Sequence, residues 1–348
     1  MINEVTCFYY GENCLDGLVS AWIVKQNYPE AKLIPVNYQQ RPEEYPSGKV
    51  FVVDFTFPRK EDMVGLIENA DVVYHYDHHR SAQKVYEELA QTYGDNDRYR
   101  PMFRLDLSAA MITFDQLALP EETRIPEKEI IHGFPRESFT RTYERHLISY
   151  VEDRDLWIWR YWPQSKYFTV ALRERIGREN SQSAMLRIID QMTQTHFEET
   201  IAIGRRLYQE QVRRARHYIR TTLSELELYN PEDLEILEVP CVEATSKKDV
   251  SETAHQMLKD EFSDVVAVIY SEDNETLRVR ISASDRKPQA DRIAQFYGGG
   301  GHPKAAGITT KNGDPLYAHI TRKMENYCHR VGPKYREQLN RHCGQEGL

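Results

Sequence analysis

Short apolar segments alternate with segments of helical periodicity through the first half of this 348-residue chain. The apolar segments are rich in β-branched and aromatic residues and have polar residues at both ends, which predicts buried strands. Alternation of strands and helices is typical of a mostly parallel sheet with helices on both faces, an α/β fold. The predicted strands are residues 5–10, 32–36, 50–53 and 72–74, and the predicted helices are 18–26 and 58–69.

A charged segment of strongly helical character, from about residue 181 to 227, separates this pattern from a second one. It contains no proline and only Gly204 as a breaker, so a long connecting helix is predicted. The strand–helix alternation then resumes, which predicts a second, smaller α/β domain. We expect an N-terminal domain at 1–170, a helical connector at 171–230, the smaller domain at 231–330 and a polar tail at 331–348. In the smaller domain the predicted strands are 235–239, 265–270 and 277–281, and the predicted helices are 250–261 and 289–296.

The charge balance excludes some partners. Lys and Arg number 45 against 54 Asp and Glu, a net charge of −9, so a general binder of long duplex nucleic acid is not expected. A local site on an acidic protein can still be positive, which leaves small anionic substrates open. No apolar stretch has the length of a membrane span, the N-terminus lacks a signal-peptide pattern, and the five cysteines form no C-x-x-C pair. We therefore expect a cytoplasmic protein without a membrane partner.

Acidic residues and histidines follow the predicted strands of the first domain. Asp16 lies shortly after the first strand, Asp54 directly after the third, and Asp77, His78 and His79 after the fourth. Because the carboxyl ends of parallel strands meet at one edge of the sheet, these side chains are expected to converge there. A single aspartate at a strand end usually caps a helix or turn, but three such loops favour a cation that neutralises the group. Oxygen ligands mixed with imidazole suit Mn²⁺ or a similar dication.

Four consecutive glycines begin the most specific motif, GGGGHPKAAG, in the second domain. Gly298, Gly299, Gly300 and Gly301 leave the backbone free to adopt positive φ and to direct successive N–H groups at an anion. His302, at the end of the run, can donate to a phosphate oxygen. The alternative is a flexible loop, but linkers rarely end in His-Pro followed by small residues. The motif therefore predicts a phosphate-binding loop.

Together, the Asp77-His78-His79 sequence and the glycine motif resemble the DHH phosphoesterase superfamily with its DHH-associated C-terminal domain. That group includes RecJ-like exonucleases, nanoRNases that degrade short oligonucleotides, and cyclic-dinucleotide phosphodiesterases. The resemblance covers roughly residues 3–325. It implies that the first domain is the DHH catalytic, metal-binding domain and that the second binds substrate. It also implies an active site in the cleft between the two domains, and it makes a homodimer a further expectation.

The resemblance also implies roles for single residues. Asp54 would bridge two Mn²⁺ ions, His78 would ligate the second of them, and Asp16 matches the second acid of the family's first motif. Asp77 and His79 would be catalytic, with His79 contacting the scissile phosphate. One or two Mn²⁺ ions are expected, with Mg²⁺, Zn²⁺ and Fe²⁺ as alternatives.

Two further motifs leave the ligand set open. The family's fourth motif corresponds to YVEDRDLW, in which Asp155 is the preferred ligand and Asp153 the alternative. The family's first motif, usually His-x-x-x-Asp-x-Asp, has Tyr10 and Cys14 at its first two positions here, so the first metal loses two usual ligands. Glu12, Cys14 as a thiolate, the aspartate of the DHH sequence or water could compensate. A thiolate would favour Zn²⁺ or Fe²⁺, and the alternative is that Cys14 is a small packed residue.

The predicted activity is metal-dependent hydrolysis of phosphodiester bonds in short oligonucleotides or dinucleotides, through a water whose pKa the metal lowers. The glycine motif and His302 would hold the substrate's phosphate. Arg280 and Ser282 are either secondary contacts or ordinary strand positions. One alternative is a catalytically impaired nucleotide- or phosphate-binding protein, since Tyr10 and Cys14 replace usual ligands. The other is a phosphomonoesterase or polyphosphatase of the same superfamily.

Overall fold

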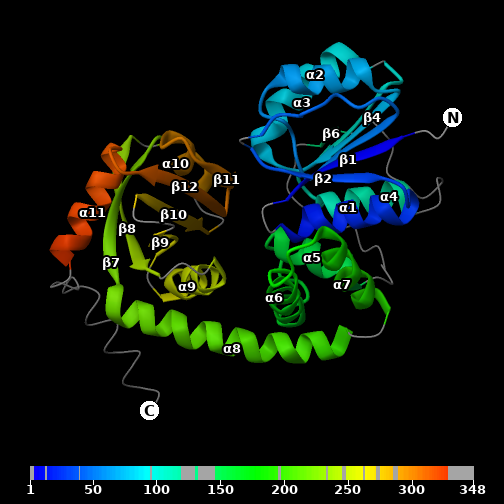
Figure 1. Ribbon diagram of the computed structural model, residues 1–348. Coiled ribbons are helices and arrows are strands. Elements are labelled where there is room, and N and C mark those ends of the chain that lie inside the picture. Colours follow the sequence, from blue (N-terminus) through cyan, green and yellow to red (C-terminus); the bar gives the residue numbers. More distant parts are fainter. Residues whose placement is uncertain are drawn as a thin grey trace. The chain divides into compact units, whose positions relative to one another are not determined.

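The computed structural model describes residues 4–11, 14–38, 40–94, 96–118, 130–131, 146–194, 197–232, 234–244, 248–261, 263–271, 275–284 and 289–327. The chain divides into two compact units, Met1–Leu207 and Tyr208–Leu348. The boundary lies inside helix α8 (Phe197–Thr222) (Figure 1). Among the described helices, none is both long enough and apolar enough to cross a membrane.

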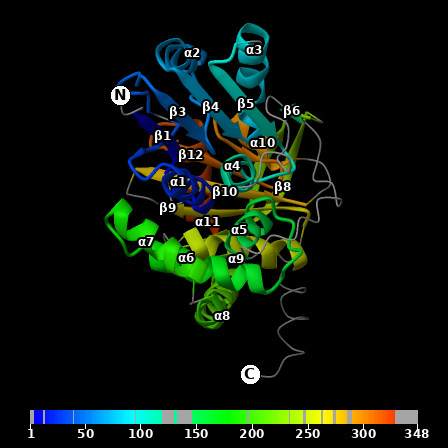
Figure 2. The same cartoon turned by 90° about the vertical axis from the view of Figure 1, so that its right-hand side faces the viewer.

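The first unit is built on a parallel sheet. In the described residues it has six strands in the order β2-β1-β3-β4-β5-β6, and all neighbouring strands run parallel. Figure 2 shows β3, β4 and β5 side by side. The strands are β1 (Val5–Tyr10), β2 (Lys32–Val36), β3 (Lys49–Val53), β4 (Val72–Asp77), β5 (Tyr99–Arg104) and β6 (Ile130–Ile131).

Helices cover both faces of this sheet, because alternate residues of each strand point to opposite sides. Cys7 and Tyr9 of β1 share a core with α1, α4, α5, α6 and α7, whereas Phe8 shares a different core with α2 and α3. Figure 1 shows α2 and α3 above the sheet and α1 and α4 below it. The helices are α1 (Leu15–Asn27), α2 (Lys60–Asn69), the 3-10 turn η1 (Arg80–Ala82), α3 (Gln83–Tyr93), α4 (Ala109–Ala118), α5 (His146–Asp155), α6 (Gln164–Ile176) and α7 (Gln182–Gln194).

The strand order contains a topological switch point. From β1 the chain crosses to β2 at one edge of the sheet, and from β3 onward strands are added on the other side of β1. The connections that leave the carboxyl ends of β1 and β3 therefore diverge, which opens a crevice between them. In open α/β sheets this crevice is where ligands bind.

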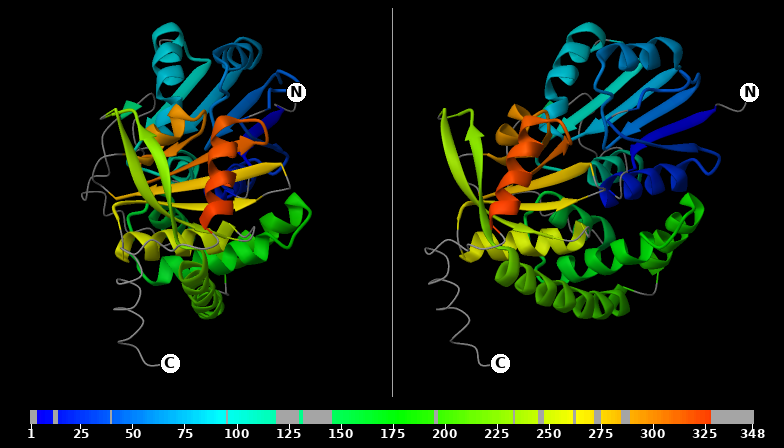
Figure 3. Two further views of the ribbon diagram at one scale, coloured as in Figure 1. Left: turned by 90° about the vertical axis from the view of Figure 1, so that its left-hand side faces the viewer. Right: turned by 60° about the vertical axis from the view of Figure 1, so that its left-hand side comes forward.

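The second unit has a mixed sheet of its own. In the described residues its strand order is β11-β12-β10-β9-β8-β7, and only β8 and β9 pair in parallel. Helices α10 and α11 contribute to the core on one face, and α9 and the C-terminal part of α8 to the core on the other; α11 is the red helix in Figure 3. The elements are β7 (Ser224–Asn230), β8 (Glu235–Glu243), α9 (Lys248–Glu261), β9 (Val265–Ser271), β10 (Thr276–Ala283), α10 (Ala290–Phe296), β11 (Gly300–His302), β12 (Ala305–Lys311) and α11 (Pro315–Tyr327).

The predicted α/β class, with a parallel N-terminal sheet and a second, smaller α/β domain, is confirmed. The prediction of one long helix to residue 227 is wrong, because α7 and α8 are separate helices and β7 begins at Ser224. In β7 the buried Leu226 and Leu228 alternate with glutamate, a period of two that suits an antiparallel partner. The four-part division and the site between domains stay predictions, and the predicted tail lies outside the described residues.

Candidate metal centre

Candidate metal ligands follow the carboxyl ends of two neighbouring strands, β3 and β4, at the switch-point edge of the first sheet. Asp54 directly follows β3, Asp77 is the last residue of β4, and His78 and His79 come next. Asp54 has a left-handed backbone conformation, with φ of 55°, and its N–H donates to the carbonyl of Tyr76 (2.9 Å). Aspartate tolerates this conformation better than most residues, and strained positions of this kind cluster at functional sites.

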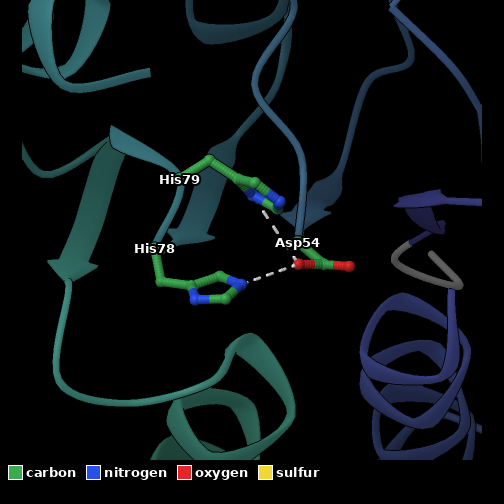
Figure 4. A group of neighbouring side chains, drawn as sticks. All are labelled: Asp54, His78 and His79. Atoms are coloured by element: carbon green, nitrogen blue, oxygen red, sulfur yellow. Dashed lines mark hydrogen bonds and ion pairs between the residues drawn. The ribbon is translucent and has the colours of Figure 1, made fainter. Parts of the chain in front are cut away.

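His78 is the residue on which the carboxylates converge. Its Nε2 lies 3.2 Å from Asp54 Oδ1, 3.3 Å from Asp155 Oδ2 and 3.5 Å from Asp16 Oδ2, and its side chain is 1% exposed. His79 Nδ1 lies 3.8 Å from the same Asp54 oxygen. Figure 4 shows the His78 and His79 rings both extending toward Asp54. One ring nitrogen carries at most one proton, so it cannot satisfy three carboxylates at once.

Backbone N–H groups of α4 hold Asp16 in place. Its two carboxylate oxygens accept hydrogen bonds from the N–H groups of Ala109 (2.7 Å) and Ala110 (2.9 Å), at the start of that helix. Glu152, from α5, accepts from the N–H of Ser108 (3.1 Å). The N-terminus of a helix favours negative charge. Burial nevertheless raises the pKa of Glu152 to about 8, and the nearby charge of Asp16 adds to this effect.

The acidic groups repel one another. Burial, followed by the charge of Asp16, raises the pKa of Asp54 well above its ordinary value, and burial followed by the charge of Asp155 raises that of Asp16. A divalent cation would reverse this effect. Two groups of possible metal ligands meet here, and within each group the ligand atoms lie within 4.8 Å of one another. One group is Asp54, His78 and His79, and the other is Asp16, His78 and Asp155. This donor set of carboxylates and imidazoles fits Mn²⁺ or a similar ion.

Cys14 belongs to neither of these two groups among the described residues. It is the residue before α1, and its thiol donates to Asp54 Oδ2 (3.1 Å). Burial, together with the charges of Asp54, Asp155 and Asp16, raises the pKa of the thiol well above its ordinary value. In this structure Cys14 is thus a hydrogen-bond donor to Asp54. Glu12, another candidate from the sequence, lies outside the described residues.

Asp77 is surrounded by hydrogen-bond donors. Its Oδ1 accepts from the N–H groups of His78 (2.7 Å) and His79 (3.1 Å) and from His79 Nδ1 (2.7 Å), and its Oδ2 accepts from the hydroxyl of Thr56 (2.6 Å). Burial opposes ionisation of Asp77, but the charge and hydrogen bond of His79 outweigh it, so its pKa is lowered. In return, burial works against a charged His79, but Asp77 raises the pKa of that imidazole overall.

A buried chain of hydrogen bonds continues behind Asp77. Because the Thr56 hydroxyl gives its one proton to the carboxylate, it must accept from His75 Nε2, 2.9 Å away. His75 Nδ1 is then the acceptor for the hydroxyl of Tyr99 (2.9 Å). Burial lowers the pKa of His75 to about 3, which keeps the ring neutral as this order of protons requires. The chain therefore runs in one direction, from Tyr99 to Asp77.

Asp153 and Asp155 have different positions. Asp155 belongs to the second donor group, whereas Asp153 accepts from the N–H groups of Arg160 (2.6 Å) and Tyr161 (3.1 Å) and from the hydroxyl of Ser165 (2.6 Å). The carboxylate of Asp153 thus holds the loop between α5 and α6. This arrangement leaves Asp155 as the nearer of the two candidates to His78.

The glycine motif of the second unit forms a tight turn into β11 and β12. Gly298 and Gly301 have φ of 75° and 147°, and a Cβ added at Gly299 would lie 2.2 Å from the carbonyl oxygen of Gly307. Arg280 of β10 pairs with Gly307, which in turn pairs with Gly300. A Cβ added at Gly307 would lie 3.5 Å from Nη1 of Arg280, so this guanidinium lies against the motif. The side chain of His302 lies outside what the structure describes.

Several residues of the site were not found from the sequence. They are the glycine that approaches Asp54, the threonine and histidine behind Asp77, and the acid on α5: Gly17, Thr56, His75 and Glu152. Only His75 carried a usable signal. It lies two residues before Asp77 on β4, so it shares a face of the strand with that aspartate.

The first unit is a doubly wound α/β domain with a group of carboxylates and imidazoles at its switch point, the arrangement of a metal-binding α/β protein. Residues 237–329 match the family model of the DHHA1 domain. The glycine motif lies within these residues, and the Asp77-His78-His79 sequence ends β4 in the first unit. The chain thus contains a DHHA1 domain, in agreement with the resemblance of its sequence to the DHH superfamily. No curated protein matches the sequence of this chain.

Solved structures resemble the chain at low identity. PggH, a pGpG-specific phosphodiesterase from Vibrio cholerae, is 13% identical with a TM-score of 0.48, and the match covers 94% of this chain and 100% of that chain. An exopolyphosphatase-related protein from Bacteroides fragilis is 12% identical with a TM-score of 0.45, covering 94% and 93%. RecJ from Thermus thermophilus, in complex with Mn²⁺, is 13% identical with a TM-score of 0.46, covering 94% and 52%. This chain thus spans about half the length of that RecJ.

Gly17→Ala is expected to disturb the centre directly. An added Cβ would lie 2.3 Å from the carbonyl oxygen of Tyr10 and 3.1 Å from Asp54 Oδ2, so β1 and α1 would have to separate. We expect the affinity for Mn²⁺, measured by titration calorimetry, to fall about 10–100-fold. The control is Gly177→Ala, whose added Cβ has one close neighbour, the Arg173 carbonyl at 3.0 Å. Equal Mn²⁺ affinity of the two variants would contradict the packing argument.

Thr56→Val tests the buried chain of hydrogen bonds. The variant leaves Asp77 and His75 each without one partner, which should lower the free energy of unfolding by about 1–3 kcal/mol. Thr56→Ser keeps the hydroxyl and should retain the histidine tautomers of the wild type in ¹H–¹⁵N NMR spectra, whereas Thr56→Val should change them. Thr169→Val is the control, since that buried hydroxyl bonds the carbonyl of Ser165 (2.7 Å) in its own helix. Unchanged tautomers in Thr56→Val would show that the order of protons is wrong.

Proposed function

We propose that this protein is a metal-dependent phosphoesterase that hydrolyses phosphodiester bonds of short oligonucleotides or dinucleotides. The observation that carries the proposal is the convergence of three carboxylates within 3.5 Å of His78 Nε2 at the switch point. Buried carboxylates gathered so closely are unfavourable without a cation. A carboxylate-rich centre in a domain of this class is suited to hydrolysis of phosphate esters.

The residues that would hold the cation are Asp54, His78, Asp16 and Asp155, with His79 at the side of Asp54. When bound, a divalent ion supplies Lewis acidity and lowers the pKa of water. Mn²⁺ is the proposed ion, and the two donor groups, which share His78, are compatible with one or two ions. The hydrogen bonds from α4 keep Asp16 oriented as a carboxylate without help from the ion.

His79 is suited to stabilise charge on a phosphate oxygen. Asp77 bonds its Nδ1 and favours the protonated ring, so the proton on Nε2 can be donated to an oxygen on which charge develops. The chain through Thr56 and His75 prevents Asp77 from turning away. Asp77 therefore acts on the reaction through His79.

The DHHA1 domain would bind the phosphate of the substrate. The glycine motif adopts positive φ at two positions, which suits N–H groups directed at an anion, and Arg280 lies against Gly307. The net charge of −9 disfavours a long polyanion, because no extended basic surface is expected on such a chain. A short substrate, held at one phosphate by this domain, is therefore preferred.

A second candidate function is nucleotide binding without catalysis. It is favoured by Cys14, whose thiol donates to Asp54 at a position where the family usually has an acid. Metal content separates the two candidates, since a binder with an impaired centre would hold no stoichiometric Mn²⁺. Phosphomonoesterase or polyphosphatase activity is a further alternative, and cytoplasmic location and a homodimer stay predictions.

Hydrolysis of labelled RNA and DNA of two to five nucleotides, with Mn²⁺ and with an EDTA control, tests the proposed activity. We expect cleavage that EDTA abolishes and that His78→Ala reduces by at least about 100-fold, because the residue facing three carboxylates is lost. The stoichiometry of Mn²⁺ measured by mass spectrometry should fall in parallel. His217→Ala, a change on α8, is the control. Turnover of His78→Ala at the wild-type rate would show that the site is wrongly assigned.

Arg280→Gln tests the role of the DHHA1 domain. Removal of the guanidinium beside the glycine motif should raise KM about 10-fold or more and leave kcat little changed, because uniform binding is lost. His302→Ala, which the motif predicts to act in the same way, should show the same pattern. Arg278→Gln, also on β10, is the matched control. A fall in kcat with unchanged KM would exclude a binding role for these residues.

A further inference from the structure

Three aromatic side chains stand together at the carboxyl edge of the first sheet. Tyr10 ends β1, Tyr38 lies two residues beyond β2, and Phe55 follows Asp54. The ring centroid of Tyr38 lies 5.2 Å from that of Tyr10 and 5.1 Å from that of Phe55, and Tyr10 stacks on Phe55 at 6.3 Å. We call these three residues the aromatic wall.

The aromatic wall borders the candidate metal centre. The rings of Tyr10 and Tyr38 each lie 6.4 Å from the ring of His79, both in edge-on geometry. Burial, followed by the charges of Asp77 and Asp54, raises the pKa of the Tyr38 hydroxyl well above its ordinary value.

The wall presents one ring to solvent. Tyr38 is 41% exposed, whereas Tyr10 is half-buried and Phe55 is fully buried. Tyr45 offers a contrast, because it is similarly exposed (38%) but its hydroxyl donates to Asp62, away from the centre. Tyr38 is thus backed by two rings that hold it, so little conformational entropy is lost when a ligand stacks on it.

An exposed aromatic ring beside a phosphate-handling centre suits one class of substrate. Nucleobases stack on aromatic side chains with little dependence on sequence, because every base has a π-face. An inorganic polyphosphate has no such face and gains nothing from a wall of phenol and phenyl rings. The aromatic wall therefore favours phosphate esters that carry a nucleobase over phosphate compounds without one.

We propose that Tyr38 stacks on a nucleobase of the substrate next to the phosphate that His79 contacts. This inference rests on the proposed function and narrows its substrate class to esters that carry a base. Tyr10 and Phe55 support Tyr38 from behind and do not contact the base themselves.

The test compares the hydrolysis rates of an adenine dinucleotide and of its analogue without bases. Both substrates carry ribose or both carry deoxyribose, whichever the wild type hydrolyses. Tyr38→Ala should lower kcat/KM for the dinucleotide between about 5-fold and 100-fold, chiefly through KM, and leave the abasic analogue unchanged. Tyr38→Phe and Tyr38→Trp should retain activity. Tyr38→Leu keeps apolar packing without a π-face and should behave like the alanine variant. Tyr45→Ala is the control for loss of an exposed tyrosine.

Two results would overturn the inference while the proposed function stands. One is a wild type that hydrolyses both substrates equally well, and the other is Tyr38→Ala losing the same factor on both. Failure of the proposed function has a different signature, since the wild type would then hydrolyse neither substrate with Mn²⁺. In that case binding of AMP and of ribose 5-phosphate is measured by calorimetry. If Tyr38 stacks on the base, Tyr38→Ala should weaken the binding of AMP and leave the binding of ribose 5-phosphate unchanged. Equal weakening of both would overturn the inference.

Discussion

Mutual repulsion of buried carboxylates is the constraint around which the first unit is organised. Asp16, Asp54 and Asp155 come from three separate elements and meet within 3.5 Å of one imidazole nitrogen. Such a group is unfavourable unless each charge has donors or a cation. The switch point brings the strand ends together, and the first turn of α4 supplies two N–H groups to Asp16. The close approach of Gly17 to Asp54 then sets how near α1 can lie to β3.

Two aspartates of the same edge have opposite environments, and this difference indicates different roles. Asp54 has its pKa raised by burial and by neighbouring acids, whereas Asp77, with several donors around it, has its pKa lowered overall by His79. Titratable groups whose pKa values are moved apart by their surroundings commonly divide the work of a site. On this reasoning Asp54 is the group that a cation would relieve. Asp77 already has its compensation within the protein, so its negative charge is available to orient His79 and to stabilise the protonated form of that ring.

Much of this architecture could be predicted from local sequence, and the remainder depends on contacts between distant residues. The strands at 5–10 and 32–36 match the structure because apolar period and turn residues are local signals, and the acids at their ends follow from the sheet rule. The bonds from Ala109 and Ala110 to Asp16 span more than 90 residues, which no local pattern encodes. The strand at Ser224–Asn230 was missed because glutamate and leucine are good helix formers, while pairing with β8 decides its structure.

The two departures from the family's first motif have a common structural effect. Where the motif usually has an imidazole, Tyr10 contributes a ring to the aromatic wall, and where it usually has an acid, Cys14 donates to Asp54. Both residues place neutral groups at the same edge of the sheet. Binding energy from parts of the substrate remote from the reacting phosphate can be used to orient the reacting group. The ring of Tyr38, backed by Tyr10, is placed to supply such energy if the substrate carries a base, as proposed above.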